Sequence, residues 1–266
     1  MADIERPGAQ RWVPTSGGVP ALRAAAPGCR GCELWAPATQ VVFSEGPARA
    51  RLMLVGEQPG DVEDREGEPF VGPAGRVLDQ ALGAAGLDRD DVYLTNAVKH
   101  FRFVERGPRR IHKTPAVVHL RACLPWLEAE LAAVRPRVVV ALGATAARAL
   151  LGHDVTVGEV RGRVLDGAGD RAEDGAGDGV EDGAGDRAED GAGDRAEDGA
   201  GDGVAHRVGA PRGEASHAAG WPVLVTAHPS AVLRLRDRAE RHAAMAALAA
   251  DLRVAAAAAV QEGRRV

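Results

Sequence analysis

The chain has 266 residues, of which 45% are hydrophobic and 3% aromatic, and its formal net charge is −5. This content favours a globular protein with one sizeable core or two small ones. The N-terminus lacks a basic stretch followed by an apolar run, no charge-free apolar segment is long enough to cross a bilayer, and three cysteines are too few for a disulfide framework. We therefore expect a soluble intracellular protein without a membrane partner.

Strand-like and helix-like patterns alternate along the chain. The predicted strands are residues 51–55, 91–96, 137–143 and 221–228, and the predicted helices are residues 73–86, 114–134, 144–152 and an alanine-rich segment from about Asp237. Such alternation is typical of a parallel sheet that is covered on both faces. We predict an α/β fold with three layers, α/β/α, around a central, mostly parallel four-stranded sheet.

In sheets of this kind, ligands bind beside the carboxyl ends of the strands. Loops begin at these ends at Gly56, Asn96, Gly143 and His228, and we expect them to converge on one cleft. The first loop is rich in glycine and proline, which lets backbone amides approach a ligand. A purely structural turn would have the same composition.

An acidic repeat separates the third and fourth predicted strands. Residues 166–204 repeat the octapeptide DGAGDRAE or DGAGDGVE and contain 14 acidic and 3 basic residues, whereas the rest of the chain has 24 acidic and 30 basic residues. Because the repeat lacks large side chains, we predict a disordered surface insertion; a calcium-binding solenoid, the alternative, would need an apolar residue in each repeat. The single domain would comprise residues 19–165 and 205–260, after a flexible tail at residues 1–18. Its mildly basic charge is compatible with nucleic-acid binding.

Five motifs occur in one order. They are GEQPG (56–60), GEPFVGPAG (67–75), LTNAVKH (94–100), RRIHKTP (109–115) and TAHPSAVLR (226–234). Together they resemble the iron-sulfur uracil-DNA glycosylases of family 4, and most closely the UdgX-type uracil-DNA-binding proteins. The resemblance covers residues 19–252 outside the acidic repeat, and it implies the glycosylase fold and a substrate of uracil-containing DNA, single- or double-stranded.

The resemblance implies roles for the side chains around an extruded uracil. His228 would donate to uracil O2 and stabilise the leaving anion, Asn96 would bind the O4 and N3 edge, and Phe70 would stack on the base. Ser230 would lie in the same substrate site. Taken alone, these residues have ordinary explanations: Asn96 caps a strand end, Phe70 belongs to the core, and His228 is a loop histidine.

In the UdgX-type proteins, the histidine that corresponds to His112 attacks C1′ and stays bonded to the DNA. The step resembles that of a retaining glycosidase, except that an alkylated imidazole is a poor leaving group. Glu57 would orient the ring and receive or stabilise its proton. From composition alone, a basic loop whose histidine only touches phosphate is the simpler interpretation.

Four more residues are expected in the same pocket. Gln58 and Asp61 would shape it, and Arg109 and Arg110 would hold the RRIH loop against phosphate or against pocket residues, because a planar guanidinium group binds oxyanions with two hydrogen bonds.

Cys29 and Cys32, in the sequence CRGC, have the spacing of metal or cluster ligands, and Cys123 lies on the predicted helix after the RRIH loop. In the hydrolytic relatives a cysteine follows the VK pair, and here His100 occupies that position. The resemblance therefore implies a [4Fe-4S] cluster held by these three cysteines and His100. Three cysteines and one histidine also suit structural zinc, which is the alternative.

Three functions follow from these features. The first is a uracil-DNA glycosylase that excises uracil and forms a stable covalent adduct through His112 in a single turnover. The second is a multiple-turnover family 4 enzyme in which Glu57 directs water. The third is a non-catalytic iron-sulfur or zinc module that binds nucleic acid. For this protein we expect a monomer in the cytoplasm, associated with the nucleoid.

Overall fold

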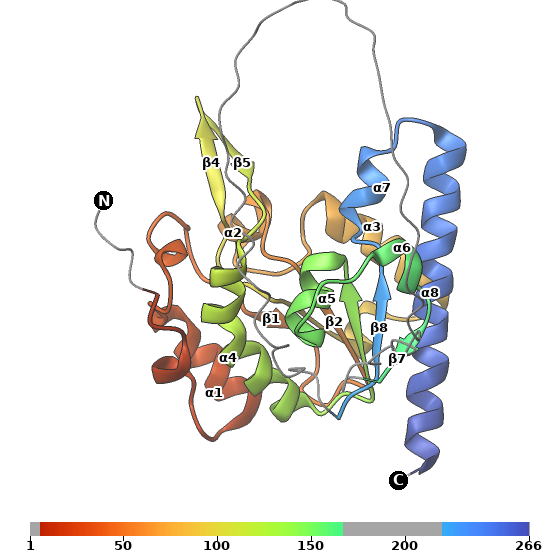
Figure 1. Cartoon of the computed structure of the whole chain (residues 1–266), viewed down its shortest axis with the longest axis horizontal. Coiled ribbons are helices and arrows are strands. Elements are labelled where there is room, and N and C mark those ends of the chain that lie inside the picture. Colours follow the sequence, from red (N-terminus) through yellow and green to blue (C-terminus); the bar gives the residue numbers. More distant parts are fainter. Residues whose placement is uncertain (1–5, 167–219, 266) are drawn as a thin grey trace, which may run out of the picture. The chain divides into compact units, whose positions relative to one another are not determined.

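The computed structural model describes residues 6–166 and 220–265. Helices cover a sheet of six strands, and a separate two-stranded hairpin projects from one end (Figure 1). The strands are β1 (Ser44–Glu45), β2 (Leu52–Gly56), β3 (Val92–Asn96), β4 (Phe103–Arg106), β5 (Arg109–His112), β6 (Val138–Leu142), β7 (Val164–Leu165) and β8 (Val223–Thr226). The α-helices are α1 (Gly18–Ala25), α2 (Asp61–Glu66), α3 (Pro73–Ala85), α4 (Val117–Val134), α5 (Ala144–Leu151), α6 (Val157–Val160), α7 (Ser230–Arg234) and α8 (Arg238–Arg265). Short 3-10 helices lie at Gln10–Trp12, Ala26–Gly28, Glu33–Trp35 and Arg89–Asp91.

The strand order of the sheet is β1-β3-β2-β6-β8-β7. Its four central strands are parallel and correspond to the four predicted strands. The prediction of a four-stranded sheet is nevertheless wrong in number, because β1 and β7 add antiparallel pairs at the two edges. Each edge strand has two residues, which is too short for a period of two to be recognised.

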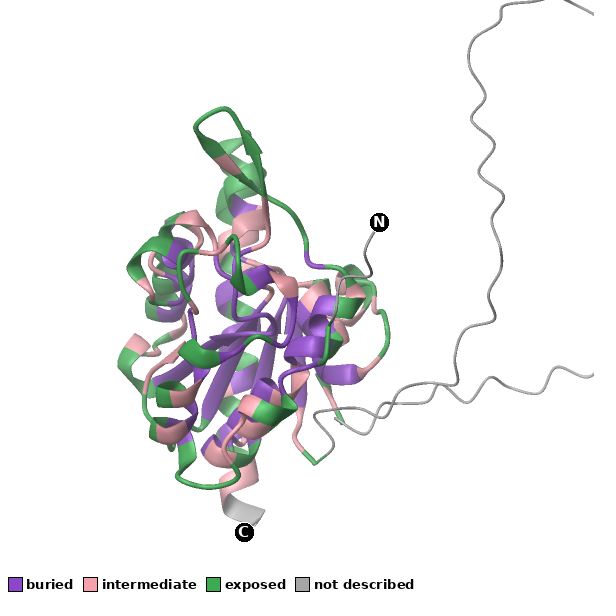
Figure 2. Cartoon of the chain, turned by 90° about the vertical axis from the view of Figure 1, so that its left-hand side faces the viewer, coloured by how far each residue is buried: buried purple, intermediate pink, exposed green. Residues whose placement is uncertain are grey.

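Side chains of the central strands alternate between two cores. Met53 and Val55 point into a core shared with α1, α4 and α5, whereas Leu52 and Leu54 point into a core shared with α3 and α8. Both faces of the strands are therefore buried, as Figure 2 shows. This arrangement confirms the predicted layers and explains why the strands are continuous apolar runs.

The last helix, α8, begins at Arg238, one residue after its predicted start. By length and composition alone, α8 could span a membrane. Its residues Leu248 and Leu252 are instead buried against the sheet, and the Asp251 carboxylate accepts a hydrogen bond from Thr226 Oγ1. In this fold α8 thus packs as a core helix.

Residues 6–18 differ from the predicted flexible tail. Ala9 is fully buried, and its N–H donates to the carbonyl of Ala122 on α4 (2.8 Å). The predicted acidic insertion, residues 166–204, lies outside the described residues apart from Asp166.

The start of α4 also differs from the prediction, which placed it at Thr114. The helix begins at Val117, because the N–H of Ala116 donates to His119 Nδ1 (2.9 Å) and this side chain caps the first turn. The residues before Ala116 remain extended and return from the hairpin.

The RRIH motif lies on this β4–β5 hairpin rather than in an irregular loop. Its strands pair in antiparallel register, with Phe103 opposite His112. Most of the hairpin is exposed and projects beyond the carboxyl ends of the parallel strands (Figures 1 and 2). His112 is the last residue of β5, where the hairpin returns to the domain.

Candidate active site

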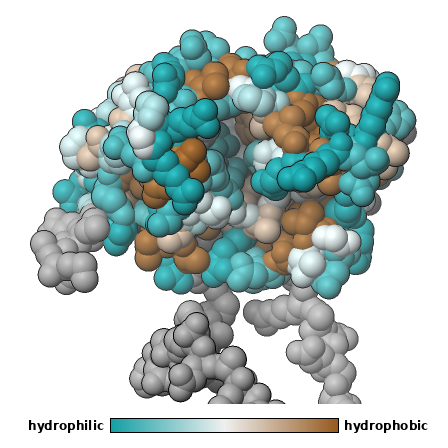
Figure 3. Space-filling view, turned by 90° about the horizontal axis from the view of Figure 1, so that it is seen from above, coloured by the Kyte–Doolittle hydropathy of each residue, from teal (hydrophilic) through white to brown (hydrophobic). Residues whose placement is uncertain are grey.

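The loops at the carboxyl ends of the parallel strands converge, as predicted. Gly56 and Asn96 are partners at the ends of β2 and β3, and a Cβ added at Gly56 would lie 2.3 Å from Asn96 Oδ1 and 2.6 Å from Phe70 Cζ. A Cβ added at Gly143 would lie 3.1 Å from His228 Cβ. Seen from above, this face is largely hydrophilic and is hollowed between apolar patches (Figure 3).

Phe70 is held in the left-handed backbone region, with φ of 58°. Non-glycine residues rarely adopt this conformation, and it occurs preferentially at functional sites. Gly75 permits it, since a Cβ there would lie 1.7 Å from the Phe70 carbonyl oxygen. The ring is buried beside that of His228, with centroids 6.4 Å apart, where the resemblance predicts a base-stacking residue.

Ser230 fixes the tautomer of His228. The Ser230 N–H donates to His228 Nδ1 (3.1 Å), and Ser230 Oγ lies 2.8 Å from the same nitrogen. Burial lowers the pKa of His228 to about 4; Glu57 opposes this shift, and the charges of His112 and Arg234 add to it. The ring is therefore neutral near pH 7, with its proton on Nε2.

His112 pairs with Glu57 at the end of the hairpin. His112 Nε2 lies 3.3 Å from Glu57 Oε1, and Thr145 Oγ1 donates to Glu57 Oε2. Burial raises the pKa of Glu57, but hydrogen bonds from His112 and Thr145 outweigh burial, so the pKa lies below its ordinary value. Glu57 is therefore a carboxylate at neutral pH. The His112 side chain is 47% exposed and can reach a ligand from outside.

Gln58 fixes the two ends of the hairpin instead of pointing into open space. Its Nε2 donates to the carbonyl oxygens of Arg102 (3.1 Å) and Lys113 (3.2 Å), and its Oε1 accepts the N–H of Arg102 (3.0 Å). Arg102 and Lys113 flank β4 and β5. A single side chain from the first loop thus sets where His112 emerges.

Arg110 anchors the hairpin to α2. Its guanidinium group donates to Asp61 Oδ1 (2.5 Å) and Asp64 Oδ2 (2.6 Å), and it lies 5.0 Å from the Phe103 ring centre. Arg110 was predicted to contact either phosphate or pocket residues. In the structure its guanidinium group binds the carboxylates of two protein residues, Asp61 and Asp64. Arg109 is exposed on the same hairpin.

Thr145 and Phe101 are site residues that sequence analysis missed. Thr145 lies two residues after Gly143, so the convergence of loops at strand ends could have suggested it. The buried Phe101 ring lies 6.1 Å from that of His112. Its sequence pattern gives no sign of this contact, which depends on how the hairpin folds back.

The three cysteines lie in one buried region formed by the N-terminal segment and α4. All three are buried and free, and they belong to one core cluster. The main-chain N–H of Lys99 donates to Cys123 Sγ (3.3 Å), and Trp126 Nε1 donates to Cys29 Sγ (3.3 Å). Lys99 directly precedes His100, so the main chain that leads to the fourth predicted ligand contacts Cys123.

The thiols of Cys32 and Cys123 favour the protonated state in the absence of a cation. Burial raises the pKa of Cys32 to about 11 and that of Cys123 to about 12, and burial lowers the pKa of His100 to about 4. Across residues 6–166 and 220–265, no three or more His, Cys, Asp or Glu side chains are arranged to hold a metal ion.

Comparisons with known proteins show which family the chain belongs to. The family model described as the uracil DNA glycosylase superfamily matches residues 43–253. The chain is 40% identical over 144 residues to the type-4 uracil-DNA glycosylase of Thermotoga maritima, covering 54% of this chain and 71% of that protein. It is 39% identical over 142 residues to the type-4 enzyme of Archaeoglobus fulgidus (52% and 68% covered) and 36% identical over 156 residues to the type-5 uracil-DNA glycosylase of Pyrobaculum aerophilum (52% and 66% covered). The chain belongs to the uracil DNA glycosylase superfamily.

Proposed function

We propose that this protein excises uracil from DNA and bonds to the resulting deoxyribose through His112. The observation that carries the proposal is the contact between His112 Nε2 and the Glu57 carboxylate (3.3 Å), at the edge of a site that also contains Asn96 and His228. A nucleophile, an adjacent carboxylate and a hydrogen-bond donor for the leaving group are the parts that such a reaction needs.

Recognition of the base involves Asn96 and Phe70. The Asn96 amide can donate to uracil O4 and accept from N3–H, and cytosine presents the reverse pattern. Phe70 offers a ring face on which the extruded base can stack. Both side chains are buried in the protein and abut Gly56, so neither has to be ordered by the substrate.

Departure of uracil leaves negative charge on the base and positive charge on the sugar. The C1′–N1 bond breaks with its electron pair on uracil, and the Nε2–H of His228 donates to O2 of that anion. Because His228 is neutral, it acts as a hydrogen-bond donor and need not lose a proton. The carboxylate of Glu57 stabilises the positive charge on the sugar.

Capture follows when the lone pair of the unprotonated nitrogen of His112 forms a bond to C1′. The ring then carries a positive charge, which Glu57 stabilises by hydrogen bonding to Nε2 or by accepting a proton. The alkylated imidazole leaves poorly, so the adduct persists and turnover ends.

A second candidate is hydrolytic excision with multiple turnover. The observation that favours it is the 40% identity to an enzyme named as a type-4 uracil-DNA glycosylase. In that mechanism Glu57 directs water to C1′, and His112 only positions the substrate. The two mechanisms share every residue of the base site and differ only in what attacks.

We further propose that Cys29, Cys32, Cys123 and His100 hold a [4Fe-4S] cluster. Each ligand of a cluster binds its own iron, so the ligands surround a volume instead of meeting at one ion. Cys29, Cys32 and Cys123 are buried and free, and the resemblance of the five motifs to the iron-sulfur glycosylases favours a cluster over zinc. The N–H groups directed at Cys29 and Cys123 would stabilise bound thiolates, and the cluster would tie the N-terminal segment to the base of the hairpin.

Incubation with a uracil-containing oligonucleotide tests the first mechanism. A protein–DNA band that survives a denaturing gel, with one uracil released per protein, supports capture. Repeated release of uracil without the band supports hydrolysis, and no release contradicts both. His112→Gly should abolish the band, whereas His153→Gly, a matched change of an exposed histidine that follows the C-terminal end of α5, should leave it intact.

The metal proposal has a separate test. The purified protein should contain about four irons for each chain and absorb broadly in the visible range, as expected for a cluster of this type. Stoichiometric zinc without visible absorption would contradict it.

A further inference from the structure

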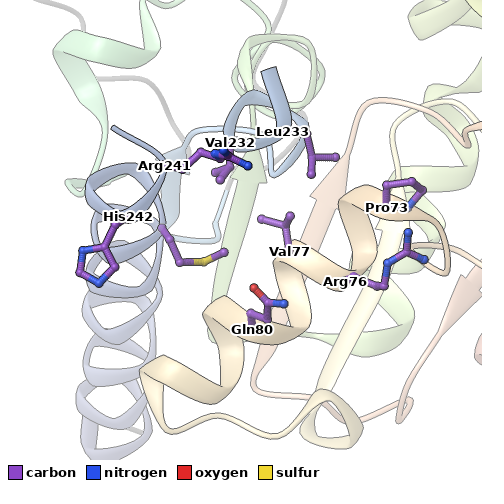
Figure 4. A pocket seen from close by; sticks show the side chains of 9 residues that line it. Pro73, Arg76, Val77, Gln80, Val232, Leu233, Arg241 and His242 are labelled. Atoms are coloured by element: carbon purple, nitrogen blue, oxygen red, sulfur yellow. The ribbon is translucent and has the colours of Figure 1, made fainter. Parts of the chain in front are cut away.

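A groove lies beside the candidate active site, between α3, α7 and α8 (Figure 4). It encloses about 410 Å³. Val77 of α3, Val232 of α7 and Met245 of α8 line it, while Arg76 projects from α3 and Arg241 from the start of α8. We call it the arginine groove; it has an apolar lining with a guanidinium group on each side.

Positive charge is in excess around the arginine groove, although Asp237 and Glu240 lie among its arginines. Five exposed arginines lie on the segments that form it: Arg76, Arg234, Arg236, Arg238 and Arg241. None of them forms an ion pair with a carboxylate anywhere in the described ranges. Asp79, on the same helix as Arg76, pairs with Arg89 instead (2.7 Å). The groove therefore attracts an anion that is not part of the described protein.

The arginine groove continues from the active site. Its α3 wall begins three residues after Phe70, and its α7 wall begins two residues after His228. Both residues contribute side chains to the proposed base site. A polymer that places one unit in that site can therefore extend along the groove.

We propose that the arginine groove binds the sugar-phosphate backbone of the DNA strand on one side of the extruded nucleotide. This inference rests on the proposed function, because it takes the polymer to be the DNA substrate. Phosphates would contact Arg76 and Arg241, since guanidinium groups bind phosphate with paired hydrogen bonds. The sugar carbons would lie against Val232, Met245 and the exposed Leu233.

A double variant tests the groove against a matched control. Arg76→Gln/Arg241→Gln removes the two flanking charges. Arg49→Gln/Arg253→Gln removes two exposed charges elsewhere. Arg49 precedes the amino end of β2, and Arg253 lies farther along α8, where it donates to Ala84 O (3.1 Å). Both variants keep the residues of the base site.

Binding is measured by fluorescence anisotropy with uracil-free single-stranded oligonucleotides over a range of salt concentrations. The groove variant should bind roughly tenfold more weakly than the control, and the slope of log K against log salt should fall by about 1.4, as expected for two lost phosphate contacts to a single strand. Equal affinities and slopes for the two variants would overturn the proposal.

A second measurement locates the strand. Oligonucleotides that contain one deoxyuridine are extended only on the 5′ side or only on the 3′ side, and uracil release is followed in a single turnover. One extension should accelerate wild-type release but not release by the groove variant; the same gain in both would contradict the inference. If the wild type released no uracil, the proposed function would be contradicted instead. The anisotropy comparison of the two variants would still test whether the arginine groove binds DNA.

Discussion

Lys99 Nζ donates to the main-chain carbonyl of Asn96 (2.9 Å), so a buried charge supports the backbone of the residue that faces the proposed uracil edge. The Lys99 side chain is 1% exposed, and it forms an ion pair with Glu130, which is fully buried. It also donates to Thr95 Oγ1 (2.6 Å). This buried group lies directly behind the carboxyl ends of β2 and β3.

Lys99→Met should lower the free energy of unfolding by about 3–5 kcal/mol, because it leaves the Glu130 carboxylate buried without its ion-pair partner. Urea denaturation of samples with equal metal content measures the change. Glu130→Gln in the same chain should restore part of the loss. Tyr93→Phe, which removes the hydroxyl that bonds to Glu130 Oε1 (2.9 Å) and Ser44 Oγ (2.8 Å) but leaves the ion pair intact, should cost only about 2 kcal/mol. A Lys99→Met loss no larger than that of Tyr93→Phe would show that the ion pair does not carry the stability.

Gly56→Ala should impair uracil release more than it impairs folding. The new methyl group would displace the Asn96 amide or the Phe70 ring, and small displacements of positioned groups cost roughly 10- to 100-fold in rate. Gly83→Ala is the matched control: it lies inside α3, and its added methyl group meets nothing within 4 Å. That change should leave the rate unaltered and stabilise the protein by up to about 1 kcal/mol. Single-turnover assays and urea denaturation of both variants decide between a local and a general effect.

The sequence predicts the central sheet because β2, β3, β6 and β8 are buried on both faces, which produces apolar runs that are long enough to recognise. It also predicts that Asn96 and His228 meet, since parallel strands bring their carboxyl ends together. The partners of Arg110 could not be predicted from the sequence, because a guanidinium group binds phosphate and carboxylate alike. Only the position of the hairpin against α2 shows that carboxylates are its partners. The contact of Phe101 with His112 could not be predicted either, because it forms only when the hairpin folds back on the domain.

Arg110→Ala should loosen the hairpin that carries His112. It removes hydrogen bonds to Asp61 and Asp64, so residues 103–112 should exchange amide hydrogens faster, and capture by His112 should slow by roughly 10- to 100-fold. Hydrogen-exchange mass spectrometry and the rate of adduct formation measure these effects.

Arg109→Ala is the control on the same strand, because Arg109 is exposed and makes no ion pair with another described residue. It should leave hydrogen exchange unchanged. If Arg109 contacts a phosphate, this change should lower DNA affinity and reduce the salt slope by about 0.7–0.9. Equal exchange rates in the Arg110 variant and the wild type would contradict the anchoring role.

His228 should make the stability of the protein depend on pH in the acidic range. Its folded pKa is about 4, whereas an unfolded histidine has a pKa of about 6.5. Between these values the unfolded chain binds a proton that the folded chain does not, so the free energy of unfolding falls as pH is lowered from about 6.5 to about 4. Above pH 7 neither state is protonated and the contribution vanishes.

The variant His228→Asn removes this titration. Its free energy of unfolding should fall less between pH 7 and pH 5 than that of the wild type, by on the order of 2 kcal/mol. Urea denaturation at pH 7, 6 and 5 measures both proteins. Parallel losses in the two proteins would mean that folded His228 takes up its proton as readily as the unfolded chain does. His228 would then be partly positively charged near pH 6. The proposal that a neutral His228 donates to uracil O2 would be wrong at that pH.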